Sequence, residues 1–261
     1  MTNWTAVTEE LARWTDLDRR CPLWLRDDDA VAASRQLDEL LTRCANAGIP
    51  LGLAVIPADA EPSLAEALAD HAHVTPLVHG WSHTDHAAPG RKKCEFGPER
   101  PPETRQAEAE RGLSTLRGLF GDRVLPLFVP PWNRMAPDMP SCLSASGYRA
   151  VSAFGPSPAP RDGIAWINTH LDLIDWRGSR SAVPLDGLLD LLCRELRDRR
   201  EGRRIPAEPI GLLTHHRVHD AAIWDLLDRL LDRLADHPAV EWLAIASLGI
   251  ASLGRPAPKT D

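Results

Sequence analysis

The stretch Leu77-Val-His-Gly-Trp-Ser-His-Thr-Asp-His86 places three of the chain's ten histidines within eight residues. It follows an apolar run, 74–78, that predicts a strand. Gly80 allows a sharp turn after this strand, so the imidazoles of His79 and His83 can converge. Imidazole is a frequent ligand of Zn²⁺. A histidine pair at this spacing is more often a surface or core feature than a metal site, so the interpretation depends on partners elsewhere in the chain.

Runs of strand length alternate with amphipathic stretches of helix length along the chain. No internal repeat or linker divides them, and seven or so β/α units in sequence predict one parallel, barrel-like α/β domain. We expect a helical extension at 1–20, the barrel at 21–250, and a flexible tail at 251–261. Strands are predicted at 21–26, 51–56, 74–78, 124–129, 149–153, 164–168, 210–214 and 240–245, and helices at 8–18, 31–47, 62–71, 103–120, 143–147, 185–200 and 221–237.

Polar motifs follow several of the predicted strands. In parallel α/β folds the carboxyl ends of the strands lie on one rim, where sites are built. Side chains separated by nearly 190 positions can therefore meet there. The motifs in question are Asp27–Asp29, the pair His79 and His83, Trp132-Asn133, Asp172–Trp176 and His215.

Composition excludes several classes of protein. A net charge of −7 argues against a nucleic-acid partner, because no basic excess is present to neutralise phosphates. No apolar run approaches the ~20 residues of a membrane span, and residues 1–10 lack the pattern of a signal peptide. The five cysteines are scattered and have no CxxC spacing, which is typical of reduced thiols. We therefore predict a cytoplasmic protein.

Three consecutive carboxylates end the first predicted strand, in Arg26-Asp-Asp-Asp29. Adjacent carboxylates repel each other, so such a run needs a cation or full solvation. One aspartate together with His79 and His83 would form a two-histidine, one-carboxylate ligand set with a coordination position left for water and substrate. A second aspartate could then act as general base. The alternative is an ordinary turn or helix cap, with Asp29 as the cap.

A late strand delivers His215, which could protonate a leaving group. Asp175, in the segment Asp172-Leu-Ile-Asp-Trp176, could accept a hydrogen bond from the ring of a catalytic histidine and fix its tautomer. The alternatives are a structural imidazole and an ordinary turn.

Three of the nine tryptophans, Trp81, Trp132 and Trp176, lie in or beside polar motifs. Indole faces suit the apolar faces of sugar rings, although tryptophan is more often simply core. The rigid Pro130-Pro-Trp-Asn133 segment could aim the backbone N–H of Trp132 at a developing oxyanion.

In this order, these blocks resemble the polysaccharide deacetylase family, carbohydrate esterase family 4, over roughly residues 21–250. The family motif His-Ser/Thr-x-x-His is similar to His79-Gly-Trp-Ser-His83, with Gly80 in the Ser/Thr position. The motif Leu-x-x-His is similar to Leu212-Leu-Thr-His215, and Asp172–Trp176 resembles the Asp-x-x-Asp-Trp motif. The resemblance implies a distorted (β/α)7-type barrel in a single domain.

Two motifs depart from the family pattern. Thr-Phe-Asp-Asp-Gly appears as Arg26-Asp-Asp-Asp-Ala30, which makes Asp28 the base and Asp29 the metal ligand. A shift by one position would give Asp27 and Asp28 instead. Arg-x-Pro-Tyr appears as Val129-Pro-Pro-Trp132 and lacks the arginine that braces the base in the family. Arg26 and Arg134 are the candidates to replace that arginine.

The resemblance implies a metal-dependent hydrolase that removes an acetyl group from an N-acetylated sugar or a small-molecule amide. The expected ion is Zn²⁺, with Co, Ni or Mn as alternatives. Two other functions stay open: a C–N hydrolase of a ureide or amidine, and a non-catalytic carbohydrate-binding descendant. The expected metal ligands are Asp29, His79 and His83; the catalytic residues Asp28, His215, Asp175 and Trp132; and the substrate-binding residues Trp81, Pro131, Trp132, Asn133, Trp176 and Leu212.

Overall fold

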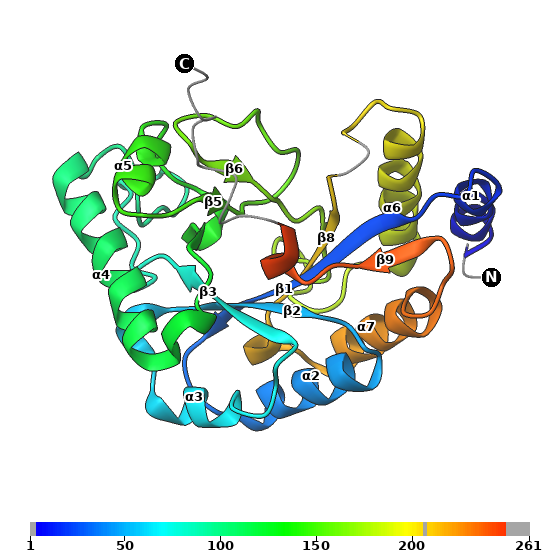
Figure 1. The fold of residues 1–261 in the computed structure, drawn as a ribbon, viewed down its shortest axis with the longest axis horizontal. Helices are drawn as coiled ribbons and strands as arrows, with labels where there is room; N and C mark the ends of the chain where they lie inside the picture. Colours follow the sequence, from blue (N-terminus) through cyan, green and yellow to red (C-terminus); the bar gives the residue numbers. More distant parts are fainter. Residues whose placement is uncertain (1–3, 206–207, 249–261) are drawn as a thin grey trace, which may run out of the picture.

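Nine strands run parallel in one curled sheet within the described residues, 4–205 and 208–248, of this computed structural model (Figure 1). The sheet order is β6-β5-β4-β3-β2-β1-β8-β7, and β9 pairs with the start of β1. The predicted single α/β barrel domain is confirmed, in the form of a half-barrel. The strands are β1 Cys21–Ala30, β2 Leu51–Val55, β3 Val74–His79, β4 Leu127–Val129, β5 Ala150–Val151, β6 Ala165–Trp166, β7 Leu171–Asp172, β8 Ile210–Thr214 and β9 Val240–Trp242.

Helices cover the outer face of the sheet (Figure 1). Ser34 caps α2 by accepting from the N–H of Leu37, and Asp220 caps α7 by accepting from that of Ile223. The short strand β7 is the element that the sequence pattern did not predict. The helices are α1 Trp4–Asp16, α2 Arg35–Asn46, α3 Pro62–Ala67, α4 Pro102–Phe120, α5 Met139–Ala145, α6 Leu185–Arg200 and α7 Ala221–Leu234, with short 3₁₀ turns η1 Pro57–Asp59, η2 Gly121–Arg123, η3 Pro131–Asn133, η4 His216–Val218 and η5 Ile245–Leu248.

The two faces of the sheet carry separate apolar clusters. Side chains alternate between faces along a strand, so neighbours in sequence point in opposite directions. Leu23 and Leu25 belong to the large cluster beneath the helices, whereas Trp24 belongs to a small inner cluster shared with Leu77. This alternation decides which residues at the strand ends point into the mouth of the barrel.

The N-terminal helix α1 lies against α6 (Figure 1). The indole N–H of Trp14 donates to the carbonyl of Leu196 at 3.2 Å, and the buried carboxylate of Glu10 pairs with Arg200. The expected domain boundaries stay predictions, and the expected tail at 251–261 lies outside the described residues. All five cysteines are free thiols. Among the described helices, none has the length and apolarity that crossing a membrane requires.

Candidate active site

A bulge near the end of β1 places two consecutive carboxylates in the barrel mouth. By strand alternation Asp28 shares the inner face with Trp24, while Asp27 and Asp29 should both point toward the helices. The register between β1 and β2 shifts between Asp27 and Ala30, and Asp29 has a φ of 72°. This irregularity turns Asp29 to the inner side, next to Asp28.

Asp29, His79 and His83 converge in this mouth. Each offers one ligand atom, and these atoms all lie within 4.8 Å of one another. Oδ1 of Asp29 is 3.0 Å from Nε2 of His79 and 3.4 Å from Nε2 of His83. The three residues predicted as metal ligands are therefore brought together, and their donor set, two imidazoles and a carboxylate, is one that zinc accepts.

The protonation chemistry of this cluster calls for a positive charge. Nδ1 of His79 lies 3.0 Å from the carbonyl of Val129, so Nδ1 carries the proton and Nε2 turns toward Asp29. If the ring is neutral, a nitrogen lone pair then faces a carboxylate oxygen, and only a proton or a cation between them makes the contact favourable. Burial lowers the pKa of His79, but Asp28 and Asp29 outweigh it and raise that pKa above its usual value.

The pKa values of the two other members of the cluster, Asp29 and His83, are both lowered. Burial tends to raise the pKa of Asp29, but its hydrogen bond with His79 and the fields of His79, His215 and His83 hold it well below its usual value. Burial and the neighbouring His79 lower the pKa of His83. A carboxylate and a neutral imidazole are the forms that bind a metal ion.

Of the two arginines considered for the missing motif arginine, Arg26 is the one that contacts Asp28. Its guanidinium is completely buried, with Nε 2.9 Å from Oδ1 of Asp28 and Nη2 donating to Oδ2 at 3.0 Å. It also donates to the side chains of Asn133 at 2.8 Å and Ser152 at 2.7 Å. Arg134, the other candidate, donates instead to the carbonyl of Lys93. Asp28 is thus held from its own strand by an ion pair that includes one hydrogen bond, from Nη2 to Oδ2.

His215 also lies close to Asp28. Its Nε2 is 4.0 Å from Oδ2 of Asp28, and its ring meets the edge of Trp176 at 4.8 Å between centroids. Nδ1 of His215 is buried and has no hydrogen-bond partner among the described residues.

Asp175 does not make the predicted hydrogen bond to His215. Its two carboxylate oxygens accept from the backbone N–H groups of Gly178 and Ser179, which closes an ordinary turn. Asp172 is a further carboxylate that interacts electrostatically with His215, and burial raises the pKa of Asp172. The indole N–H of Trp176 donates to Asp172 at 2.9 Å.

Asp27 belongs to a separate, closed group. Its carboxylate accepts from the hydroxyl of Thr214 at 2.7 Å, from the backbone N–H of His216 at 2.8 Å, and from the ring of His216. Burial tends to raise the pKa of Asp27, but His216 outweighs it and lowers that pKa. With Asp27 occupied in this way, the geometry matches the alignment that pairs Asp28 with Asp29.

Glu95 shapes the turn between His79 and His83, and the sequence patterns did not single it out. It is fully buried and accepts from the backbone N–H groups of Trp81 at 3.2 Å and Ser82 at 2.7 Å. A Cβ at Gly80 would lie 2.2 Å from Oε2 of Glu95, so the glycine leaves room for this carboxylate. The one signal in the sequence is an acidic residue between the apolar neighbours Cys94 and Phe96.

Left-handed backbone is concentrated at the site. Asp29, His83, Trp132 and Asn133 all have positive φ, between 54° and 72°. Such conformations are uncommon for residues other than glycine and often mark functional sites. The Trp132 ring packs on His83 at 4.4 Å between centroids, and the Trp132 N–H lies in the first turn of η3, where N–H groups lack intrahelical acceptors.

The structure does not bring two of the predicted substrate-binding residues to the mouth. Leu212 is fully buried in the helix-facing cluster, because its place in β8 points it away from the inner face. The Trp81 ring packs under the guanidinium of Arg111 at 4.2 Å. Pro131 is buried, and its ring lies beside Gly80. The other predicted substrate-binding residues lie next to proposed site residues. Trp132 packs on His83, Asn133 accepts from Arg26, and Trp176 contacts His215.

The sheet order and this arrangement define the fold of polysaccharide deacetylases, that of carbohydrate esterase family 4, as the motifs predicted. A protein from Mycobacterium smegmatis assigned as a polysaccharide deacetylase superposes with a TM-score of 0.66 over 88% of each chain, at 15% identity. The Bc1960 peptidoglycan N-acetylglucosamine deacetylase superposes with a TM-score of 0.56 over 87% of each chain, at 14% identity.

The same fold also occurs without activity. A pseudoenzyme of this family from Bacillus anthracis superposes with a TM-score of 0.52, at 12% identity, over 82% of this chain and 60% of its own. A scan against protein-family models gave no match, and a search of curated proteins gave none either.

Proposed function

We propose that this chain is a divergent family-4 carbohydrate esterase that removes the acetyl group from an N-acetylated sugar with the help of a divalent metal ion. The observation that carries the proposal is the convergence of Asp29, His79 and His83 within 4.8 Å. Nε2 of His215 lies 4.0 Å from Oδ2 of Asp28, and this proximity suits an acid and a base that act on one substrate. The fold supports the proposal but does not itself assign an activity.

Asp29, His79 and His83 would hold the ion, which supplies Lewis-acid polarisation of the substrate carbonyl and of water. Zn²⁺ is the ion we expect, since two imidazoles and a carboxylate suit it, with Co, Ni and Mn as alternatives. His79 is preset for this role because the carbonyl of Val129 fixes its tautomer.

Asp28 accepts a proton from the water that adds to the acetamide carbonyl carbon. Arg26 orients Asp28, since its guanidinium contacts both carboxylate oxygens. His215 donates a proton to the nitrogen as the C–N bond breaks, which yields acetate and a free amine. The Trp132 N–H is the backbone donor we assign to the developing oxyanion.

The test measures metal content and acetate release together. The purified protein is loaded with Zn²⁺, Co²⁺, Ni²⁺ or Mn²⁺ in turn, its bound metal is measured by mass spectrometry, and it is assayed on N-acetylglucosamine oligosaccharides. We expect about one metal ion per chain, lost in His79→Ala. We expect Asp28→Asn to keep the metal and lose on the order of 10³-fold in kcat, because base and activated water act as a unit.

Three results would count against the proposal. Binding of no metal by the wild-type protein would remove the site. Acetate release that is equal in wild type and Asp28→Asn would remove the base. A metal-loaded protein that binds the sugar but releases no acetate would place the chain with the non-catalytic members of the fold.

A further inference from the structure

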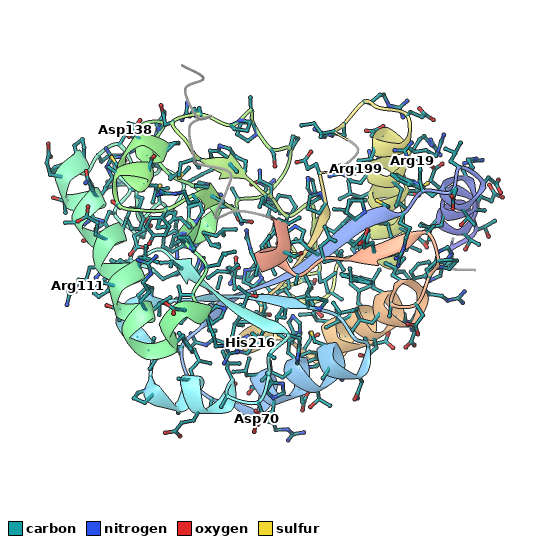
Figure 2. All side chains as sticks on the ribbon, viewed as in Figure 1. Arg19, Asp70, Arg111, Asp138, Arg199 and His216 are labelled. Atoms are coloured by element: carbon teal, nitrogen blue, oxygen red, sulfur yellow. The ribbon has the colours of Figure 1, made fainter. Side chains whose placement is uncertain are left out.

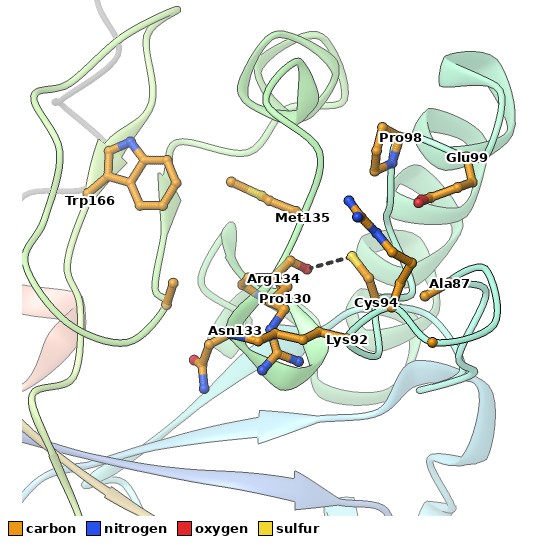
Figure 3. A pocket seen from close by; sticks show the side chains of 13 residues that line it. Ala87, Lys92, Cys94, Pro98, Glu99, Pro130, Asn133, Arg134, Met135 and Trp166 are labelled. Atoms are coloured by element: carbon orange, nitrogen blue, oxygen red, sulfur yellow. Dashed lines mark hydrogen bonds between the residues drawn. The ribbon is translucent and has the colours of Figure 1, made fainter.

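A cavity of about 640 Å³ opens beside the proposed active site. Its volume lies within the range of about 300–1,000 Å³ typical of small-molecule sites. Pro130 and Asn133 line it, so it borders the segment that carries Trp132. Figure 3 shows Trp166 on one side of the cavity and Pro98 and Glu99 on the other.

The loop between β3 and α4 forms one wall of this cavity and is tied to the segment after η3. Phe96 forms a β-bridge with Met135, and its carbonyl accepts from the N–H of Ala136 at 2.8 Å. The thiol of Cys94 donates to the carbonyl of Arg134 at 3.5 Å (Figure 3). The side chains of this loop are therefore held against the cavity by bonds on both sides of Glu95.

Positive charge dominates the lining. Arg91, Lys92 and Arg134 contribute three cations, against a single carboxylate from Glu99. None of the three cations forms an ion pair with a carboxylate among the described residues, whereas most arginines on the helices are paired. The chain as a whole has a net charge of −7, and two of its three lysines lie next to each other in this loop. A concentration of unneutralised cations in an acidic protein indicates an anionic ligand.

Two contacts connect the surroundings of the cavity to the proposed catalytic residues. One involves Lys93, the neighbour in sequence of the lining residue Lys92, and the other involves the lining residue Asn133. The ammonium of Lys93 lies 5.6 Å from the centre of the Trp132 ring, which packs on His83. Asp85 faces Lys93, and its own pKa is lowered mainly by backbone N–H groups. On the other side, the amide of Asn133 lines the cavity and accepts from Arg26, the partner of Asp28. The cavity therefore adjoins the segment that contacts both His83 and Arg26.

We infer that the substrate is an N-acetylated amino sugar that carries an anionic group, a phosphate or a carboxylate, and that this group binds in the cavity. The inference rests on the proposed function. Arg91 and Arg134 suit a phosphate or carboxylate because guanidinium can bind either group with two parallel N–H donors, and Lys92 adds a point charge. Trp166 and Met135 provide an apolar surface for the face of the sugar.

The experiment compares kcat/KM for acetate release from three substrates: N-acetylglucosamine 1-phosphate, N-acetylmuramic acid and neutral diacetylchitobiose. The pocket variant carries Arg91→Gln, Lys92→Gln and Arg134→Gln. The control carries Arg35→Gln, Arg203→Gln and Arg229→Gln, which change the net charge equally at exposed, paired cations away from the cavity.

In the wild type we expect at least one anionic substrate to exceed the neutral one by about tenfold or more, and the preferred anion identifies phosphate or carboxylate. In the pocket variant we expect that advantage to disappear through a higher KM, with the neutral substrate within about threefold of wild type. The control should keep the advantage. Raising the salt from about 0.05 M to about 0.5 M should shrink it in the wild type, because exposed charges are screened.

Equal kcat/KM for all three substrates in the wild type would overturn the inference, as would an anion preference that survives in the pocket variant. If no substrate releases acetate, the proposed function fails, and calorimetric titration with N-acetylglucosamine 1-phosphate then decides the inference separately. Binding that weakens about tenfold in the pocket variant and not in the control supports an anion site. Binding that is absent, or equal in both variants, contradicts it.

Discussion

Two groups of carboxylate and imidazole side chains leave the end of β1 on opposite faces of the sheet. Asp29 meets His79 and His83 in the barrel mouth, with about a quarter of the Asp29 and His83 side chains exposed. Asp27 meets His216, which Figure 2 labels, and both side chains are essentially inaccessible. Residue type is therefore a poor guide to function here, since the same pair of side chains makes an open site in one place and an anchor in the other.

Hydrogen bonding explains the difference. Asp27 receives donors from Thr214 and from both the backbone and the ring of His216, so its lone pairs are occupied by the protein. Asp29 faces the Nε2 atoms of two imidazoles, which leaves its negative charge for a cation. A saturated carboxylate stabilises the fold, whereas an unsaturated one is available for binding.

The largest expected effect is on metal affinity. The same substitution, aspartate to asparagine, should have very different effects in the two groups. Asp29→Asn should weaken Zn²⁺ binding by about 1,000-fold, or about 4 kcal/mol, because a neutral amide replaces an anionic ligand. Asp27→Asn should leave the affinity within about threefold. Isothermal titration with Zn²⁺ measures both, and equal losses in the two variants would show that the groups are not distinct.

The second prediction reverses the order of the two variants. Asp27→Asn should lower the free energy of unfolding by about 3 kcal/mol, because it replaces a buried carboxylate that accepts three hydrogen bonds from Thr214 and His216. Asp29→Asn should change it by clearly less, since its carboxylate is partly exposed. Urea denaturation of the metal-free proteins gives the two values. A larger loss for Asp29→Asn would contradict the assignment of Asp27 as the anchor.

The third prediction concerns the turn that carries His83. Gly80→Ser should destabilise the protein by about 2 kcal/mol, because the new Cβ meets Glu95 and Pro131 at a φ of 58°. Gly48→Ser is the matched control, since Gly48 has a φ of 64° and open space around it, and isolates the cost of the backbone conformation. In a Glu95→Ala background the cost of Gly80→Ser should shrink. Additive costs would show that Glu95 does not fill the space at Gly80.

The smallest effect concerns the acid stability that depends on His219, whose Nε2 accepts from the backbone N–H of His215 at 3.3 Å and whose ring packs on Trp224. Burial lowers the pKa of His219 to about 4, below the value of about 6.5 in an unfolded chain. The unfolded state therefore binds a proton first as the pH falls, and stability is lost between about pH 6.5 and pH 4. Between pH 7 and pH 5 we expect His219→Gln to lose about 1 kcal/mol less than wild type in urea denaturation. Parallel losses would exclude His219 as the group responsible.

The sequence predicted the parts of the site that depend on order and spacing. The strand ends that deliver His79, His83 and His215 follow from apolar runs and their flanking residues, and these side chains do meet at one rim. The motif alignment favoured Asp28 with Asp29 and left Asp27 with Asp28 open, because strand alternation gives Asp27 and Asp29 the same face. Only the bulge, which depends on pairing with β2, separates them.

Contacts between distant segments account for the other differences. Asp175 was predicted to orient His215 because a carboxylate and an indole stood together, but its side chain closes its own turn. Glu95 lay in a segment that reads as an irregular loop, and its role exists only through Trp81 and Ser82. Arg26 was one of two candidates for the missing arginine, and it is the one that is buried beside Asp28.

The pairing of Arg26 with Asp28 has a consequence for how substrate preference can change. Both side chains project from one strand, two positions apart, so the proposed base and its counter-ion form a unit within the sheet. Residues 131–134 then need not contribute a guanidinium to Asp28. Under the proposed function, that segment is free to change with the substrate while Arg26 and Asp28 keep their pairing.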